Sequence, residues 1–300
     1  MIEETILNTM LQTGLLAITI PVVLIVAWKM YSKQSLVPFW VGMMVFIAFS
    51  RVLEMVPHMF FLVADNPVSR LINRNAFLYA VYGGLMAGLF EEVGRYAAFR
   101  FLLGKHTSKE TAVTYGIGHG GIECILVMGV TYIQYYAYGQ LINSGSMDKM
   151  IAAYNADASS KDALNQLVET IRSITQPICY FADWERVSAM MVQIALSILV
   201  FQAVRVAGKT YMLWVAVFLH MMMDFPAALY QKGVLGILPT EIIIFVIAVL
   251  VLLYAIRVYG TLDTGGAVGR RNATEEEARK HKLHQIANRR LNPSKKDDAE

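Results

Sequence analysis

Two adjacent glutamates, Glu91 and Glu92, lie in the middle of a long apolar stretch that covers residues 76–104. A charged side chain at bilayer depth costs roughly 2.5–3.5 kcal/mol on insertion scales, so such residues usually mark a functional site. Arg95 follows one helical turn later and can pair with either glutamate. The other glutamate is then free to exchange a proton in a water-poor site and to act as a general base toward water.

Two further apolar stretches each carry a histidine with a carboxylate one turn later. His119 and Glu123 lie in YGIGHGGIECILVMG, and His220 and Asp224 lie in VAVFLHMMMDFPAAL. A histidine can hydrogen-bond a water molecule or donate to the oxyanion of a tetrahedral intermediate. Amide hydrolysis needs both activation of water and stabilisation of the oxyanion, so we interpret the three polar stretches as parts of one hydrolytic site.

The composition indicates the scaffold that must hold these groups. Of the 300 residues, 56% are hydrophobic and 16% are charged, whereas about a quarter are charged in a typical soluble domain. This balance predicts an all-α, polytopic membrane helix bundle in contact with the lipid bilayer. The net charge of +3 gives no indication of a nucleic-acid partner, and we expect none.

Seven apolar runs are long enough for a helix to cross about 30 Å of hydrocarbon. We expect one transmembrane domain over residues 1–260, which contains a polar linker at 138–183 with one amphipathic helix. A charged tail at 261–300 follows it. The runs cover residues 10–31, 37–63, 76–104, 111–137, 184–204, 210–230 and 236–259.

Basic residues predict the orientation, because cytosolic loops carry an excess of Lys and Arg. They cluster after the first run, between the third and fourth, between the fifth and sixth, and after the seventh; Arg70 and Arg74 are a weaker counter-signal. We therefore predict an N-terminus outside the cell, with the linker 138–183 on the same side, and a cytosolic tail. In this orientation Glu91, His119 and His220 each lie roughly 14–17 Å from the cytosolic boundary. Three helices thus bring their polar groups to one depth.

Glycines surround His119 and line the apolar stretch that carries Glu91. Small residues let membrane helices approach one another closely. These glycines have one of two roles: they only permit close helix packing, or they also leave room for an extended substrate backbone. The sequence is compatible with both. The glycines are Gly83, Gly84, Gly88, Gly94, Gly116, Gly118, Gly120 and Gly121.

The run GLFEEVGRY, the run HGGIE and an HxxxD motif in a later span together closely resemble the YhfC family of bacterial intramembrane proteases. That family belongs to a wider glutamic-type group with the CAAX prenyl-protein endopeptidases and the PrsW proteases. The resemblance covers residues 1 to about 260. It implies a multi-pass protein of the bacterial cell membrane that cleaves a membrane-embedded or membrane-anchored peptide.

By this resemblance, Glu91 is the base that activates water, assisted by His119, while Glu92 pairs with Arg95 and holds the helix. The EExxR spacing is closer to the PrsW pattern than to the EExxxR of the CAAX group.

Further along the chain, His220 and Asp224 occupy the positions at which CAAX proteases stabilise the oxyanion with a histidine and an asparagine. An aspartate can donate there only when protonated. Glu123 is an additional carboxylate, and the resemblance gives it no role.

For cofactors, we expect none, with zinc as the alternative. Two histidines with Glu or Asp are a plausible zinc ligand set, and the family has been described as metalloproteases. The ligands would then be His119, Glu123, His220 and Asp224. The HExxH motif is not present, and the CAAX relatives work with Glu and His.

A proton-coupled transporter is the main alternative to a peptidase, because Glu, His and Asp also form proton relays in membranes. A seven-span sensor or scaffold is a third possibility, but it leaves the cost of so many buried charges unexplained. For Arg51 and Glu54, three residues apart in the run 37–63, we expect a structural ion pair.

Overall fold

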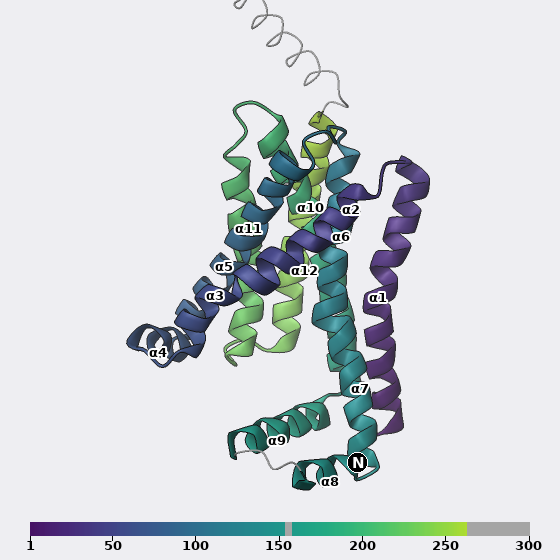
Figure 1. Ribbon diagram of the computed structural model, residues 1–300, viewed down its shortest axis with the longest axis vertical. Helices are drawn as coiled ribbons and strands as arrows, with labels where there is room; N and C mark the ends of the chain where they lie inside the picture. Colours follow the sequence, from purple (N-terminus) through teal and green to yellow (C-terminus); the bar gives the residue numbers. More distant parts are fainter. Residues whose placement is uncertain (154–157, 263–300) are drawn as a thin grey trace, which may run out of the picture.

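The computed structural model describes residues 1–153 and 158–262 and is shown in Figure 1. Every regular element in these two ranges is a helix, and seven helical segments are long and apolar enough to cross a membrane. The predicted all-α bundle and its number of spans are confirmed. The segments are Glu4–Ser32, Val37–Val63, Ala76–Leu102, Glu110–Asn143, Gln176–Arg205, Met212–Gln231 and Ile237–Thr261.

Four spans are single helices and three contain π-helical turns. In a π-helix each backbone N–H bonds to the carbonyl five residues earlier, so the side chains that follow are turned onto another face, and such segments are frequent at functional sites. The single helices are α1 (Glu4–Ser32), α10 (Gln176–Arg205), α11 (Met212–Gln231) and α12 (Ile237–Thr261). The others are α2 (Val37–Phe46), η1 (Ile47–Leu53), α3 (Met55–His58) and η2 (Met59–Val63); α5 (Ala76–Ala97) and η3 (Ala98–Leu102); and α6 (Glu110–Glu123), η4 (Cys124–Gly129) and α7 (Val130–Asn143).

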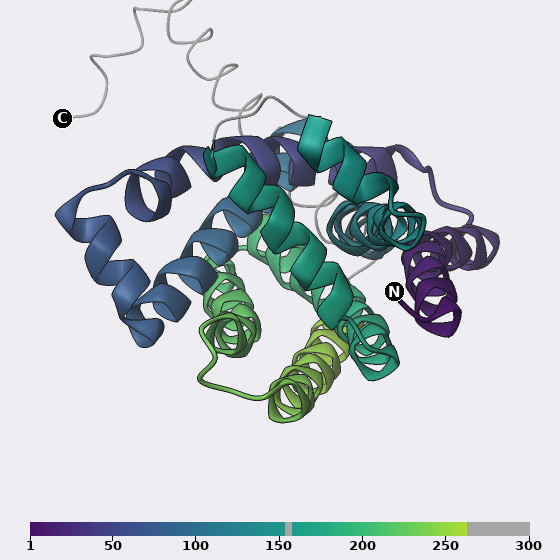
Figure 2. The same cartoon turned by 90° about the horizontal axis from the view of Figure 1, so that it is seen from below.

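Three shorter helices lie outside the spans, at the same end of the bundle as the N-terminus. They are α4 (Pro67–Arg74), α8 (Ser146–Ala153) and α9 (Ala158–Ser173). In Figure 1 this end is at the bottom, and Figure 2 shows α9 lying across it. In the predicted linker 138–183, α7 extends to Asn143, α8 and α9 follow, and α10 begins at Gln176. Val168 and Ile171 of α9 are buried in an apolar cluster with residues of α1 and α7.

The loops after α1, between η3 and α6, and between α10 and α11 lie at the opposite end, at the top of Figure 1. These are the loops whose basic residues predict the cytosolic side. The structure therefore places these basic loops together at one end of the bundle, as predicted. Which side of the membrane that end faces stays a prediction. The predicted tail 261–300 lies outside the described residues except for its first two.

The bundle is organised around α10, the most buried of the seven spans. It packs on α12, α6 and α11, while α5 packs along α11 and α2 along α6. Helices far apart in the sequence therefore meet at the centre. The apolar core contains residues of α6, α10, α11 and α12 together with parts of η3 and α2, and Tyr96 of α5 packs against it.

Two glycines illustrate how closely these helices approach one another. A side chain at Gly118 of α6 would overlap the carbonyl oxygen of Phe39 in α2, and a Cβ at Gly88 of α5 would lie 2.7 Å from the carbonyl oxygen of Val217 in α11. Cβ atoms essentially never approach a backbone oxygen so closely. The predicted packing role of these glycines is thus visible at both helix pairs, one turn or less from Glu91, Glu92 and His119.

Candidate active site

The three polar stretches predicted to share a site meet in the structure. Glu91 of α5 points its Oε2 at His119 Nε2 of α6 at 2.9 Å and lies 3.9 Å from His220 Nε2 of α11. The exposed fractions of the three residues are 5%, 0% and 4%, so all are removed from solvent. One carboxylate therefore faces two imidazoles, each from a different span.

Glu92 makes two contacts from a fully buried position. Its Oε2 lies 3.2 Å from Arg95 Nε, the ion pair expected from the spacing. Its Oε1 lies 2.8 Å from Nδ1 of His220, a contact that the sequence did not predict. A carboxylate on one ring nitrogen fixes the orientation of a histidine and increases the basicity of the other nitrogen. Glu92 thus turns His220 Nε2 toward Glu91.

Asp224 completes this side of the site one turn beyond His220. Its Oδ2 lies 3.6 Å from His220 Nε2, and its side chain is 40% exposed. When His220 is neutral and donates from Nδ1 to Glu92, its Nε2 carries a lone pair. The Nε2 atom and the carboxylate oxygens of Glu91 and Asp224 are then all acceptors, so their convergence favours a positive centre between them, either a proton or a metal ion.

Gln193 of α10, which was not predicted, connects Arg95 to the carboxylates of Glu91 and Glu123. Arg95 Nη1 donates to the Gln193 carbonyl oxygen and to Ser197 Oγ, both at 2.7 Å, and Arg95 Nη2 donates to Gln193 Oε1. Gln193 Nε2 donates to Glu91 Oε2 at 3.0 Å and to Glu123 Oε2 at 2.6 Å. The available signal was one of two glutamines inside the apolar run 184–204, and nothing in the sequence distinguishes Gln193 from Gln202.

Glu123 lies beside the site, and among the described residues it makes no hydrogen bond or ion pair with either histidine. Arg186 of α10 donates from Nη1 to Glu123 Oε1 at 3.2 Å and from Nη2 to Glu185. The structure therefore places Glu123 in an ionic group with Arg186, and Gln193 links that group to Glu91. Arg186, at the outer end of an apolar run, was also missed.

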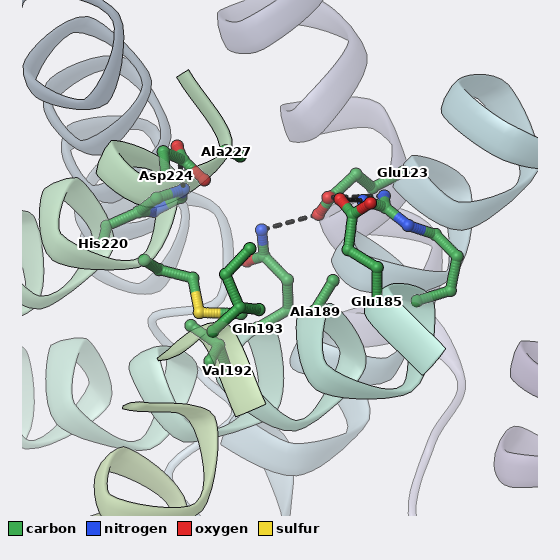
Figure 3. Close-up of a pocket in the computed structure, with 11 residues that line it drawn as sticks. Glu123, Glu185, Ala189, Val192, Gln193, His220, Asp224 and Ala227 are labelled. Carbon is green, nitrogen blue, oxygen red and sulfur yellow. Dashed lines mark hydrogen bonds and ion pairs between the residues drawn. The ribbon is translucent and has the colours of Figure 1, made fainter. Parts of the chain in front are cut away.

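A cavity of about 40 Å³ opens next to His220 and Asp224, as Figure 3 shows. A single water molecule needs roughly 10–15 Å³, so this cavity holds water but is far too small for a peptide. Its polar lining is acidic on balance. It is lined by Glu123, Glu185, Arg186, Ala189, Val192, Gln193, His220, Met223, Asp224, Ala227 and Ile244, and Glu91 and His119 are not among these residues.

The expected ion pair between Arg51 and Glu54 is wrong. Arg51 is exposed, and the buried Glu54 instead contacts His58 Nε2 at 3.2 Å. The reason is local: Arg51 lies in the π-helical segment η1, where a residue three positions later no longer shares its face. The next α-helical turn brings His58 over Glu54.

The residue types of this site fit a transition metal. In residues 1–153 and 158–262, no group of three or more His, Cys, Asp and Glu side chains is already spaced to hold a metal ion. The donor set is nevertheless suitable, because neutral imidazole and carboxylate oxygen are zinc ligands and the second nitrogen of His220 is already held by a carboxylate. Glu123 fits less well, since Arg186 and Gln193 occupy its oxygens.

Seven helices able to cross a membrane, with a buried Glu and His cluster between them, define the class of this chain as a multi-pass membrane protein. Residues 16–251 match the family model of the YhfC intramembrane metalloproteases. The chain is also 35% identical over 239 residues to the uncharacterized membrane protein YhfC of Bacillus subtilis strain 168, covering 79% of this chain and 90% of that protein. The chain therefore belongs to the YhfC family, as the motifs indicated. No solved structure matches it.

Proposed function

We propose that this protein is an endopeptidase that hydrolyses a peptide bond of a membrane-embedded or membrane-anchored substrate, with water activated by Glu91. The observation that carries the proposal is the position of Glu91, which faces His119 and His220 from two other spans in the interior of the bundle. Membership of a family described as intramembrane metalloproteases supports the same class of reaction.

Glu91 is suited to be the base because its two oxygens differ. Oε2 is held by His119 and by Gln193, whereas Oε1 makes no hydrogen bond to the residues that the structure describes. Oε1 is thus available to accept a proton from water. Contacts on the other oxygen keep the carboxylate in place while it does so.

His220 and Asp224 are suited to the substrate side of the reaction, because both line the cavity, which has room for water. With Nδ1 tied to Glu92, His220 presents Nε2 to the reacting carbonyl group, and as an imidazolium it donates to the oxyanion. Asp224 lies close enough to hold that proton on Nε2.

Zinc, if bound, would be held by His119, His220 and Asp224, and it would supply a Lewis acid that polarises the scissile carbonyl and lowers the pKa of a bound water. The roles of Glu91 as base, of Glu92 in orienting His220 and of Arg95 in pairing with Glu92 are the same with or without the metal.

Cleavage of membrane-tethered reporter peptides by the purified protein in detergent tests the proposal. Wild type should cleave, and Glu91→Gln should fold and lose activity by about 10²–10⁴-fold, the usual contribution of a general base. Glu241→Gln is the matched control, because Glu241 is a buried carboxylate on α12 that makes no hydrogen bond or ion pair with Glu91, His119 or His220, and it should cleave like wild type. EDTA followed by zinc separates a metal-dependent reaction from a metal-free one.

Full activity of Glu91→Gln would refute the proposal. Failure of wild type to cleave any reporter, together with proton uptake in vesicles that Glu91→Gln abolishes, would instead favour the proton-coupled transporter.

A further inference from the structure

Gln193 sits among charged groups from two other helices although it is only 4% exposed. On one side Arg95 donates to its Oε1, and on the other its Nε2 donates to Glu91 and to Glu123. Its backbone carbonyl accepts from Arg95 as well. One side chain of α10 is therefore in contact with both α5 and α6 at the site.

The chemistry of these partners fixes the residue type. Arg95 has only donors, and the ionised carboxylates of Glu91 and Glu123 have only acceptors. The side chain between them must offer an acceptor on one face and two donors on the other, which a primary amide does. Glutamate has nearly the same shape but offers no donor when ionised, and leucine offers neither group.

Gln193 also connects Glu91 to the wall of the cavity. It lines the cavity together with Glu123, His220 and Asp224, whereas Glu91, 3.0 Å from its Nε2, is not among the lining residues. Figure 3 shows the amide reaching across this space toward Glu123. The Glu91 carboxylate is thus held on the histidine side of the amide.

We propose that Gln193 is a positioning residue of the Glu91 site: its amide, oriented by Arg95, fixes the Glu91 carboxylate against the two histidines and ties it to Glu123 in the cavity wall. This inference rests on the proposed function and deepens it. It also gives Arg95 a second task, since the guanidinium decides which way the amide points.

The first test compares the cleavage kinetics of Gln193→Glu with wild type, with Gln202→Glu as the control. Gln202 is also a buried glutamine of α10 and takes no part in this network. For Gln193→Glu, kcat should fall about ten- to hundredfold, as for other residues that orient a catalytic group, while KM stays nearly constant because substrate binding is retained. Gln202→Glu should leave kcat and KM close to the wild-type values. Equal losses of kcat in the two variants would mean that a buried charge alone is responsible and would overturn the inference.

The second test does not depend on cleavage. Dicyclohexylcarbodiimide, a lipid-soluble reagent for carboxyl groups, is applied to wild type, Gln193→Ala and Gln202→Ala, and labelling of Glu91 is followed by mass spectrometry. Loss of the amide that donates to the Glu91 carboxylate should speed its labelling about tenfold in Gln193→Ala only, the factor expected for loss of one hydrogen bond to a charged group. Equal labelling rates in all three proteins would overturn the inference.

The two tests separate the failure of this inference from the failure of the proposed function. Cleavage by wild type with an unchanged kcat in Gln193→Glu would refute the role of Gln193 and leave the peptidase standing. Absence of cleavage with a changed labelling of Glu91 in Gln193→Ala would refute the peptidase and leave the positioning role standing.

Discussion

Two clusters in this protein place a histidine against a glutamate inside a membrane span, and they are built in different ways. In the central cluster, Glu91 contacts His119 from another span, at 2.9 Å. In the peripheral cluster, Glu54 contacts His58 one turn later at 3.2 Å, and His58 Nδ1 lies 3.0 Å from the Tyr82 hydroxyl.

Burial and connectivity separate the two clusters. The side chain of His119 is 0% exposed, whereas that of His58 is 32% exposed. The central cluster needs four helices in place, namely α5, α6, α10 and α11, while the peripheral pair forms within one turn of one span. The same two residue types thus give a preorganised site only where tertiary contacts hold them, and a local polar pair elsewhere.

The largest expected contrast is in catalysis. His119→Phe should reduce reporter cleavage by about 10²–10⁴-fold, because it removes the group that holds and assists Glu91. His58→Phe should leave the cleavage rate close to that of wild type, since the polar partners of the His58 ring among the described residues are Glu54 and Tyr82. The test is to measure the cleavage rates of both variants in the same detergent. Similar losses would show that the two clusters do not differ in their contribution to catalysis.

The next contrast is in stability. Arg95→Leu leaves Glu92 buried without its ion pair and removes the donors to Gln193 and Ser197, so unfolding should become easier by about 3–5 kcal/mol. Arg172→Leu, which breaks an exposed pair with Glu169, should cost less than about 1 kcal/mol. Equilibrium unfolding in mixed micelles measures both changes in unfolding free energy. A small change in Arg95→Leu would show that the ion pair and hydrogen bonds of Arg95 add little net stability.

Glycine substitutions extend the comparison to packing. Gly118→Ala should destabilise the bundle by about 1–3 kcal/mol, because the added methyl group forces α6 away from Phe39 in α2. A Cβ at Gly83 meets nothing within 4 Å, so Gly83→Ala should have little effect on the unfolding free energy. Thermal unfolding of the two variants tests whether close helix approach is confined to the central cluster.

The smallest effect is expected at the edge of the peripheral cluster. Tyr82→Phe removes one partly buried hydrogen bond to His58 and should lower stability by about 0.5–1.5 kcal/mol without changing the cleavage rate. A loss of cleavage in Tyr82→Phe with unchanged stability would show that the peripheral cluster takes part in the reaction.

The parts of the site that the sequence predicted are those with ionisable groups far inside apolar runs. Glu91, Glu92 and Arg95 are conspicuous there because a charge in hydrocarbon is costly, and the distance of each histidine from the end of its run gives its depth. The spans were predictable for a related reason, since length and apolarity alone define them.

The parts that it missed depend on which face of a helix turns inward. Gln193 becomes part of the site only because α10 is rotated about its axis so that this side chain lies between Arg95 and Glu91. That rotation is set by packing against other helices and cannot be predicted from one sequence. The Arg51 and Glu54 pair failed for a similar reason, because the π-helical segment η1 changes the face on which each side chain lies. Local spacing is a reliable guide only where the helix is regular.

The distance along the chain between Arg95 and its partner on α10 has a consequence for biosynthesis. The guanidinium bonds to a carbonyl 98 residues further on. At about 5–20 residues per second, a ribosome needs roughly 5–20 seconds to deliver that partner after Arg95 itself has been made. During this interval the ion pair with Glu92, three residues away in the same helix, is already available. The nascent third span therefore carries its own counter-charge into the membrane while it waits for α10.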